Sequence, residues 1–300
     1  MNAGTVTPAA EQALPRRRRL GRWRPLQSPG LPLLATATCA VLVAAAVLGP
    51  WISPYAKDSV DLANAIAPPA WQPDGTAAHL LGTDQLGRDV LSRLIAGARI
   101  SLAAAAAATL LGGSIGVAVG VVAGYIGGLA DAVAMRISDA FLAVPFILLA
   151  LAVVAVLGSG FGNIILVIVV TNWPRYARLV RSEVIGIKHR DFVTLARIAG
   201  VPPARIMLRH ILPNTLNSVT VLGILDVGRA IILESSLSFL GVGIQPPDVS
   251  WGLMLADGRT LLGFAWWLTT LPGVVIVAAV MSFNTLGYWL KARLDPRAGA

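Results

Sequence analysis

The stretch RDFVTLARIAGVPPARIMLRHILPN, residues 190–214, contains a predicted helix that ends in a sharp break. Asp191 is suited to cap this helix, because its side chain can accept a hydrogen bond from the first backbone amides. The apolar residues that follow share one helix face: Phe192, Leu195, Ala196 and Ala199. Gly200 then supplies the left-handed backbone conformation that commonly follows a helix. The segment is therefore either a solvated basic loop or a docking surface with one apolar face.

A second short helix is predicted after the glycine. Pro202 or Pro203 lies in its first turn, where the missing backbone N–H of proline is tolerated. We expect this helix to end near Leu212, because Pro213 disfavours helical geometry in the residue before it. The two helices would form a bent projection, which we call the elbow (residues 191–212).

Long apolar runs on both sides of the elbow predict a membrane protein. The chain is 56% hydrophobic and 13% charged, against roughly 25% charged in a typical soluble domain. Because a bilayer core needs about 20 residues of helix, we expect an all-α integral membrane protein with six transmembrane helices. The runs lie near 31–49, 100–123, 137–157, 160–173, 214–240 and 265–290. The fourth run is short, and either tilts or continues as a helix that starts at Pro174.

The basic residues predict the orientation of these spans. With six spans and the N-terminus inside, 18 Lys and Arg residues lie on the inner side and five on the outer side. The positive-inside rule then predicts cytoplasmic termini and a cytoplasmic loop over residues 174–213. The net charge of +9 orients such a protein and attracts anionic membrane lipid, and does not indicate a nucleic-acid partner.

The segment between the first two runs predicts a loop followed by a helix. From residue 84 to residue 98 apolar side chains recur near helical spacing: Leu86, Val90, Leu94 and Ala98. This pattern favours a helix lying in the membrane interface. The chain thus divides into a basic cytoplasmic tail (1–30), a first span with an extracytoplasmic segment and interfacial helix (31–97), a five-helix core (98–291) and a cytoplasmic C-terminal tail (292–300).

Small residues in the second apolar run indicate how the helices pack. They recur every four residues: Ala108, Gly112, Gly116, Gly120 and Gly124. Small side chains let another backbone approach closely, and such packing is the main force between helices in lipid. The strict spacing favours a packing face over a chance excess of glycine. Pro145 and Pro272 are expected either to kink the third and sixth runs or to be accommodated by their surroundings.

Three ionisable residues lie in the fifth run, where such residues are functional candidates by default. Asp226 and Arg229 are three residues apart, so we expect them to neutralise each other as a structural pair. Glu234 lies nearer the outer end of the run. Two interpretations stand for it, a gate in a transport pathway and a structural hydrogen bond.

The sequence lacks the residues that chemistry on this chain would need. None of its three lysines follows a glycine, so there is no P-loop to bind ATP. No nucleophile and base pair or carboxylate cluster suggests hydrolysis, and no catalytic residue is predicted. Cys39 is the single cysteine, and the three histidines lack metal-ligand spacing, so no metal site is predicted. Work driven by ATP would have to enter from another polypeptide.

The elbow resembles the cytoplasmic coupling loop of binding-protein-dependent ABC importer permeases. That family's pattern is Glu-Ala-Ala, three residues, Gly, nine residues, Ile, one residue, Leu-Pro. Thr194-Leu195-Ala196 stands at the Glu-Ala-Ala position and lacks its carboxylate, whereas Gly200 and Leu212-Pro213 keep the spacing, with His210 at the Ile position. The resemblance implies that the following residues couple to an ATPase: Asp191, Phe192, Thr194, Leu195, Ala196, Gly200, Arg205, His210, Leu212 and Pro213.

Two further blocks point to one branch of that family. The stretches GTDQLGRD (82–89), with ISL at 100–102, and ESSLSFLG (234–241), with SWG at 250–252, are similar to blocks in the C-type subunit of dipeptide and oligopeptide permeases. The resemblance makes Ser235 and Ser238 pathway or gate candidates together with Asp226, Arg229 and Glu234.

The resemblance implies a type I ABC importer permease fold in a bacterial cell membrane. It also implies a homologous second permease subunit, two ABC ATPase subunits that carry ATP and Mg, an extracytoplasmic solute-binding protein and a peptide substrate. The ATPases would pull the elbow and so rock the spans between outward-facing and inward-facing states. This chain itself would bind no cofactor.

Other functions stay open at this point. Family members import dipeptides, longer peptides, glutathione or nickel complexes, so the substrate is not decided by the resemblance. An ion-coupled secondary transporter could use Asp226, Arg229 and Glu234 as a relay, although the inverted repeats common in such carriers are not found in the sequence. A membrane scaffold without transport would leave the three family-like blocks unexplained.

Overall fold

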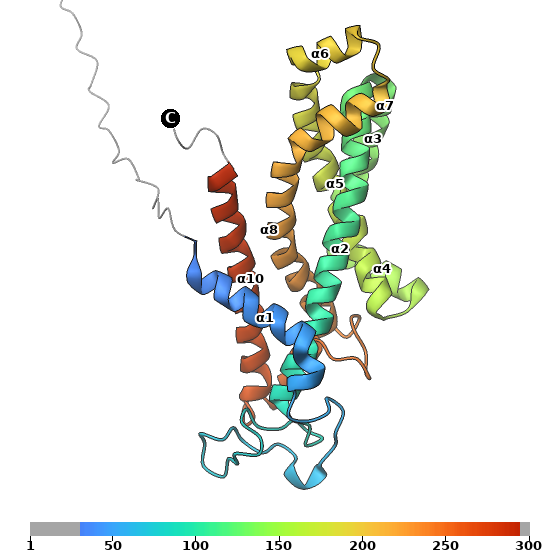
Figure 1. Ribbon diagram of the computed structural model, residues 1–300. Coiled ribbons are helices and arrows are strands. Elements are labelled where there is room, and N and C mark those ends of the chain that lie inside the picture. The colour runs from blue at the N-terminus through green and yellow to red at the C-terminus, as the bar shows by residue number, and fades with distance from the viewer. Residues whose placement is uncertain (1–30, 295–300) are drawn as a thin grey trace, which may run out of the picture. The chain divides into compact units, whose positions relative to one another are not determined.

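The computed structural model describes residues 31–294, and within this range the regular secondary structure is helical apart from one isolated bridge between Thr83 and Asp89 (Figure 1). The predicted N-terminal tail (1–30) and residues 295–300 of the predicted C-terminal tail lie outside the described residues. The α-helices are α1 (Leu33–Ile52), α2 (Val90–Ile126), α3 (Gly128–Ala143), α4 (Phe146–Leu157), α5 (Phe161–Ile187), α6 (Asp191–Ile198), α7 (Pro203–Ile206), α8 (Leu212–Phe239), α9 (Trp251–Gly258) and α10 (Trp267–Leu294). Short turns complete them: η1 (Leu62–Asn64), the π-helical turn η2 (Met207–Ile211) and η3 (Arg259–Leu261).

Four helices are long and apolar enough to cross a membrane. They are α1, α2, the continuous helix 203–239 that includes α7, η2 and α8, and α10. The pair α3 and α4 makes a fifth candidate if the two helices form one bent span. The expected fourth run belongs to α5, which is 27 residues long but carries three arginines and a glutamate in its second half. Length and composition therefore support four or five of the six expected spans.

Proline has different effects in three of these helices. No new helix starts at Pro174, because α5 runs through this buried residue without interruption. Pro272 likewise lies inside α10. At Pro145 the chain breaks, since the preceding Val144 is extended (φ −82°, ψ 124°) and α3 meets α4 at 89°, as the steric conflict between proline and the residue before it requires.

The 37-residue helix α2 packs against α1, α5 and α8 at the centre of the bundle. It begins at Val90, so the separate interfacial helix expected over residues 84–98 is wrong: residues 84–89 are a loop, and residues 90–98 are the first turns of α2. Asp89 caps α2 by accepting a hydrogen bond from the amide of Ser92 at 2.8 Å. Continuity of the apolar pattern into the following span, with no helix breaker between them, explains why the two segments merge.

The small residues of α2 pack directly against α5. A methyl group added to Gly116 would lie 2.3 Å from the carbonyl oxygen of Trp173, and one added to Gly120 would lie 2.6 Å from that of Ala177. Gly112 and Gly124 face Val169 and Val184 of the same helix. The ridge of small side chains therefore lets the two backbones approach to a distance that no larger residue permits.

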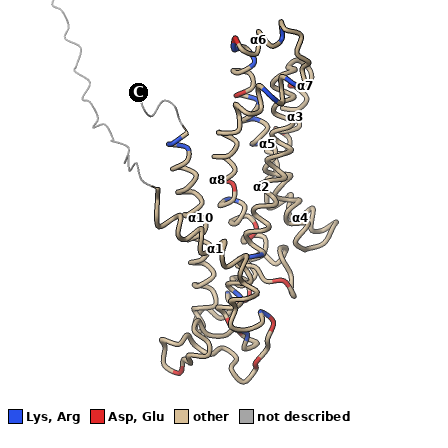
Figure 2. Tube along the Cα trace, in the orientation of Figure 1, with Lys and Arg blue, Asp and Glu red and all other residues tan. Residues whose placement is uncertain are grey.

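The elbow and the long connecting loops lie at opposite ends of the bundle. Figure 1 shows α6 and α7 at one end, and the loop 53–89 with α9 at the other. Basic residues gather around α6 and α7, whereas most of the helix length between the two ends is uncharged (Figure 2). The structure thus separates a basic end from an end built of loops.

Candidate functional site

The first helix of the elbow, α6, spans Asp191–Ile198. Its N-cap is Arg190, whose extended backbone (φ −74°, ψ 151°) turns into the helix, and the amides of Val193 and Thr194 donate to the Arg190 carbonyl at 3.0 and 3.1 Å. The expected cap at Asp191 is therefore wrong by one residue. Asp191 lies in the first turn, where a carboxylate still stabilises the helix N-terminus through the helix dipole.

The apolar residues of α6 divide between two faces. Val193 is fully buried and Ala196 packs beside it against the bundle, whereas Phe192, Leu195 and Ile198 are 38%, 64% and 78% exposed. The expected face of Phe192, Leu195, Ala196 and Ala199 is thus wrong at Ala196, which faces the chain's own core. Sequence reasoning missed Ile198, although its spacing of three residues from Leu195 places it on the same helix face. Exposed apolar side chains on a short helix are suited to contact another protein.

The turn after α6 has the predicted geometry. Gly200 adopts φ +76°, and the amide of Val201 donates to the carbonyl of Ala196 at 3.1 Å, closing the helix end. The second helix then starts as predicted, with Pro202 as N-cap and Pro203 in the first turn of α7. The left-handed residue confirms that glycine at this position sets the angle of the elbow.

The expected helix end at Leu212 is wrong, because the chain continues through it as one helix from residue 203 to residue 239. Before Pro213 the helix widens into the π-turn η2, in which the amide of Leu212 donates to the carbonyl of Met207. A π-turn displaces the backbone locally and so accommodates the proline ring, and Pro213 itself lies in the first turn of α8. The elbow is therefore joined rigidly to the span that follows it.

A buried apolar cluster mounts the elbow on the bundle. Val193, Ile206 and Ile211 of the elbow are nearly or fully buried against α2 and α5. The residues they join in this cluster are Val121, Val180, Val184 and Ile187. The guanidinium of Arg197 lies 5.9 Å from the centre of the Tyr125 ring, a cation–π contact with the end of α2. Movement of the elbow would therefore be passed directly to the spans.

The remaining predicted coupling residues are unequally accessible. Thr194, Gly200, Arg205 and Pro213 are exposed, whereas His210 and Leu212 are half-buried in the continuous helix. Polar contacts brace the neighbouring helices, since Arg181 of α5 donates two hydrogen bonds to Asp131 of α3 at 2.5 and 2.6 Å. The accessible surface of the elbow is thus centred on α6.

Inside the bundle, Asp226 pairs with a residue that sequence reasoning missed. Arg175 of α5 donates to Asp226 of α8 at 2.5 Å, and the carboxylate is almost completely buried. The expected pair between Asp226 and Arg229 is therefore wrong. No spacing rule could have found Arg175, because it is 51 residues away in the sequence and meets Asp226 only through the packing of α5 on α8.

Glu234 is a fully buried hub of hydrogen bonds. It accepts from the hydroxyl of Ser238 at 2.8 Å and from that of Ser101 on α2 at 3.0 Å, with Ser235 at 3.5 Å. Ser101 also accepts from the amide of Trp251 at 3.2 Å, and Ser250, the N-cap of α9, donates to Ser238 at 3.4 Å. The network joins α2, α8 and α9, which favours the structural interpretation of Glu234 over a gate.

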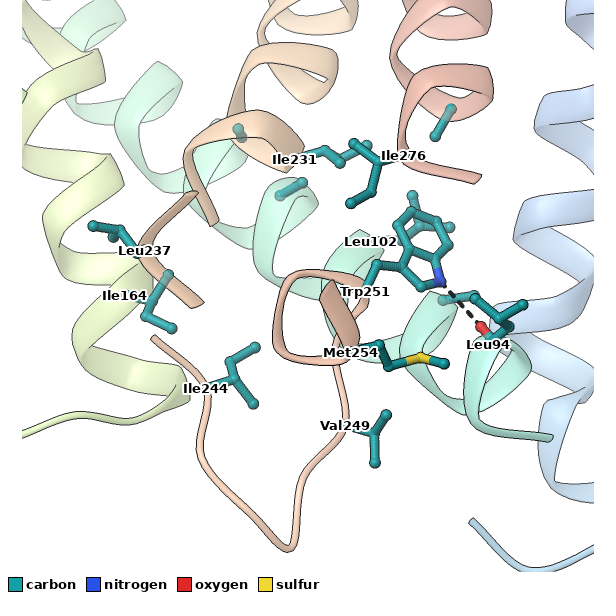
Figure 3. Close-up of a cluster of buried hydrophobic side chains, with 14 of the residues drawn as sticks. Leu94, Leu102, Ile164, Ile231, Leu237, Ile244, Val249, Trp251, Met254 and Ile276 are labelled. Carbon is teal, nitrogen blue, oxygen red and sulfur yellow. Dashed lines mark hydrogen bonds between the residues drawn. The ribbon is translucent and has the colours of Figure 1, made fainter. Parts of the chain in front are cut away.

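The helix α9 is packed into the core beside this network (Figure 3). Trp251 is fully buried, and its indole N–H donates to the carbonyl of Leu94 at 3.0 Å. At the far end of α9, Asp257 lies 3.4 Å from the buried Arg93, which also pairs with Asp84 at 2.8 Å. Partial burial raises the pKa of the Asp257 carboxyl, and the nearby guanidinium groups oppose that rise. The family-like blocks at 82–102 and 234–252 thus meet in one structure.

A large apolar cavity lies between α2 and α8. Its volume is about 1080 Å³, and its wall includes Thr109, Gly113, Tyr176, Gly223 and Phe283. A smaller cavity of about 410 Å³ lies between α5, α8 and α10.

Among residues 31–294, no group of three or more His, Cys, Asp or Glu is arranged to hold a metal ion.

Known proteins with this sequence pattern are membrane components of transport systems. The family described as binding-protein-dependent transport system inner membrane component matches residues 116–299. The di/tripeptide transport system permease protein DppC of Pseudomonas aeruginosa (strain UCBPP-PA14) is 40% identical over 257 residues, 86% of this chain and 85% of that protein. The glutathione transport system permease protein GsiD of Escherichia coli (strain UTI89 / UPEC) is 41% identical over 276 residues, 92% of this chain and 89% of that protein.

Proposed function

Because this chain belongs to the family of binding-protein-dependent transport system inner membrane components, we propose that it forms half of the translocation pathway of an ATP-driven importer of short peptides. Its relatives above are a di/tripeptide permease and a glutathione permease. Their substrates share a peptide backbone with a free carboxylate, so a short peptide is the substrate class that fits both.

Family membership also says what this chain does not do. It is an inner membrane permease and a non-catalytic subunit of an ABC transporter in the peptide and glutathione branch. ATP is bound by ATPase subunits, and a binding protein belongs to the same system. We propose that the assembly further contains a homologous second permease, two copies of the ATPase component, and a binding protein on the extracytoplasmic side.

The exposed apolar face of α6 carries the proposed function. Phe192, Leu195 and Ile198 project from a short helix whose other side is buried in the bundle. Such a face is costly in water and fits a groove on a partner, as an amphipathic helix does in helix-in-groove recognition. We propose that this partner is an ATPase subunit, and that closure of the two ATPases pulls the elbow and rocks the continuous helix 203–239.

The proposed topology has six spans and cytoplasmic termini. The bent pair α3 and α4 serves as the third span and α5 as the fourth, in addition to the four helices that qualify by length and composition. This arrangement leaves the elbow on the same side as both termini. The basic residues around α6 and α7 support a cytoplasmic elbow through the positive-inside rule, and the arrangement corresponds to the type I importer fold.

The ion-coupled alternative has less support. A relay needs charged groups that can exchange protons or ions, whereas Asp226 is buried against Arg175 and Glu234 is fully buried among serine hydroxyls. We therefore retain the ATP-driven importer as the proposed function.

Purification through a tag on this chain tests the proposal. We expect an ATPase and a second permease to copurify, and the reconstituted assembly to take up a dipeptide only with ATP and binding protein. The variant Leu195→Asp should lose the ATPase from the purified assembly. Leu62→Asp makes the same change at an exposed position in the loop 53–89, at the opposite end of the bundle. This variant should retain the ATPase. Uptake by the chain alone, or equal ATPase recovery from both variants, would contradict the proposal.

A further inference from the structure

Three charged side chains lie together near the middle of the bundle, and their charges do not balance. Asp226 lies at the centre of the 28-residue helix α8, and Arg229 follows it by one turn. Arg175 reaches Asp226 from α5. Two arginines therefore surround one aspartate, which leaves one positive charge without a partner.

The contacts of these three side chains support the excess of one positive charge. Arg175 bonds one oxygen of Asp226 at 2.5 Å, and the second oxygen, Oδ2, has no hydrogen-bond partner. Arg229 interacts electrostatically with both Arg175 and Asp226. Within residues 31–294, no carboxylate lies within ion-pair distance of Arg229. The side chain of Arg175 is 35% exposed in the single chain, whereas that of Asp226 is almost completely buried.

An unbalanced charge at this depth needs an explanation. Ionisable groups inside spans are costly, and they commonly pair with one another or mark a substrate pathway. A structural ion pair would need only Arg175 and Asp226. Arg229 adds a second cation with no ion-pair partner among the described residues, so an anionic group from outside this chain would balance it.

A cavity lies beside this group, on the side that faces the elbow end. The cavity of about 410 Å³ between α5, α8 and α10 is lined by Leu179 and Leu225. These residues lie one helical turn from Arg175 and Arg229 respectively. Lys291 lines the other part of the cavity. Arg175 and Arg229 lie one turn outside this lining, so the positive charge inside and beside the cavity favours an anion over a cation there.

We propose that Arg229 and Arg175 bind the C-terminal carboxylate of the peptide during its passage. This inference rests on the proposed function, and it assigns a direct substrate contact to this chain. A guanidinium group matches a carboxylate with two parallel hydrogen bonds, and it keeps its charge at any pH at which the cell lives. Asp226 would hold Arg175 in place between transport cycles. Glu234 takes no part, because it is fully buried in the serine network.

The selectivity for a free carboxylate tests this assignment. Cells that lack the wild-type gene are supplied with wild-type chain, Arg229→Gln or Arg229→Lys, and uptake rates of trialanine and of trialaninamide are compared. Both probes have the same side chains, and only the first has a terminal carboxylate. Because the binding protein is the same in all strains, a change in the ratio of the two rates reports the permease.

We expect Arg229→Gln to reduce the ratio of trialanine to trialaninamide uptake by about tenfold, because a site built to pair a charged group discriminates strongly against its absence. Arg229→Lys should retain most of the ratio. An unchanged ratio in Arg229→Gln would overturn the assignment. Loss of the second permease from the purified Arg229→Gln assembly would also overturn it, because Arg229 would then pair with that subunit and not with the substrate. Absence of ATP-dependent uptake with the wild-type chain would instead refute the proposed function.

Discussion

Ser101 of α2 donates its hydroxyl hydrogen to Glu234 of α8 at 3.0 Å, across 133 residues of sequence. The same hydroxyl oxygen accepts the amide of Trp251 at the start of α9. One buried carboxylate and one hydroxyl thereby connect the first long span, the helix after the elbow and the short helix at the loop end. The position of α9 depends on this connection as well as on apolar contacts.

The variant Glu234→Leu should loosen α9, because the hydroxyls of Ser101 and Ser238 lose their acceptor. Leaving buried polar groups unpaired costs about 1–3 kcal/mol each. Hydrogen exchange of the purified assembly should show faster exchange over residues 250–258. Ser236→Ala removes a hydroxyl that bonds only the carbonyl of Ile232 in its own helix, and it should leave the exchange unchanged. Equal protection in Glu234→Leu would contradict a role in holding α9.

The variant Gly116→Ala should destabilise the bundle strongly. Its new methyl group would lie 2.3 Å from the carbonyl oxygen of Trp173 and 2.5 Å from Cβ of Tyr176, so α2 and α5 must separate. Overpacking of this kind costs about 1–3 kcal/mol, which thermal unfolding in detergent would detect. Gly186→Ala on α5 meets nothing within 4 Å, and it should be neutral or slightly stabilising because alanine favours the helix. Equal unfolding temperatures for the two variants would show that the close packing is not required.

The variant Gly200→Val should uncouple ATP hydrolysis from transport while the chain still inserts into the membrane. Gly200 has φ +76° and open space around it, so the effect comes from backbone strain and not from a collision. A left-handed conformation costs a residue with a side chain about 1–2 kcal/mol, and a β-branched residue is poorly suited to it. Substrate-stimulated ATPase activity of the assembly measures coupling. Gly200→Asn should retain more activity, since asparagine tolerates this conformation. Normal activity in Gly200→Val would rule out a need for the turn.

The variant Arg175→Gln should destabilise the protein, because it leaves the buried carboxylate of Asp226 without its partner. The expected loss is about 3 kcal/mol, the low end for a broken buried pair, since Arg229 offers partial compensation. The double variant Arg175→Gln/Asp226→Asn should regain most of that stability, as measured by thermal unfolding. If the losses measured for Arg175→Gln and for a single Asp226→Asn variant simply add in the double variant, the two residues do not act as a pair.

Local features of the elbow could be predicted from the sequence because they depend on residues close to one another in the chain. Glycine frees its own backbone angles and proline restricts them. The predictions of a left-handed turn at Gly200 and of a helix start at Pro203 were therefore both correct. The end at Leu212 was wrong, since a π-turn absorbs the conflict with Pro213. Apolar runs likewise predicted helices, but not that residues 90–98 would merge with the span after them.

The sequence by itself determined that this chain is an α-helical membrane protein, because the length and hydrophobicity of a span and the angles of a turn are local properties. Only the tertiary structure decided which charges meet. Arg175 pairs with Asp226 because α5 packs on α8, and Glu234 joins Ser101 because α2 crosses beside them. Likewise, only the packing against the bundle decided that Val193 is buried while Ile198 is exposed. Such pairings depend on how helices distant in sequence rotate and approach, and no local spacing specifies that arrangement.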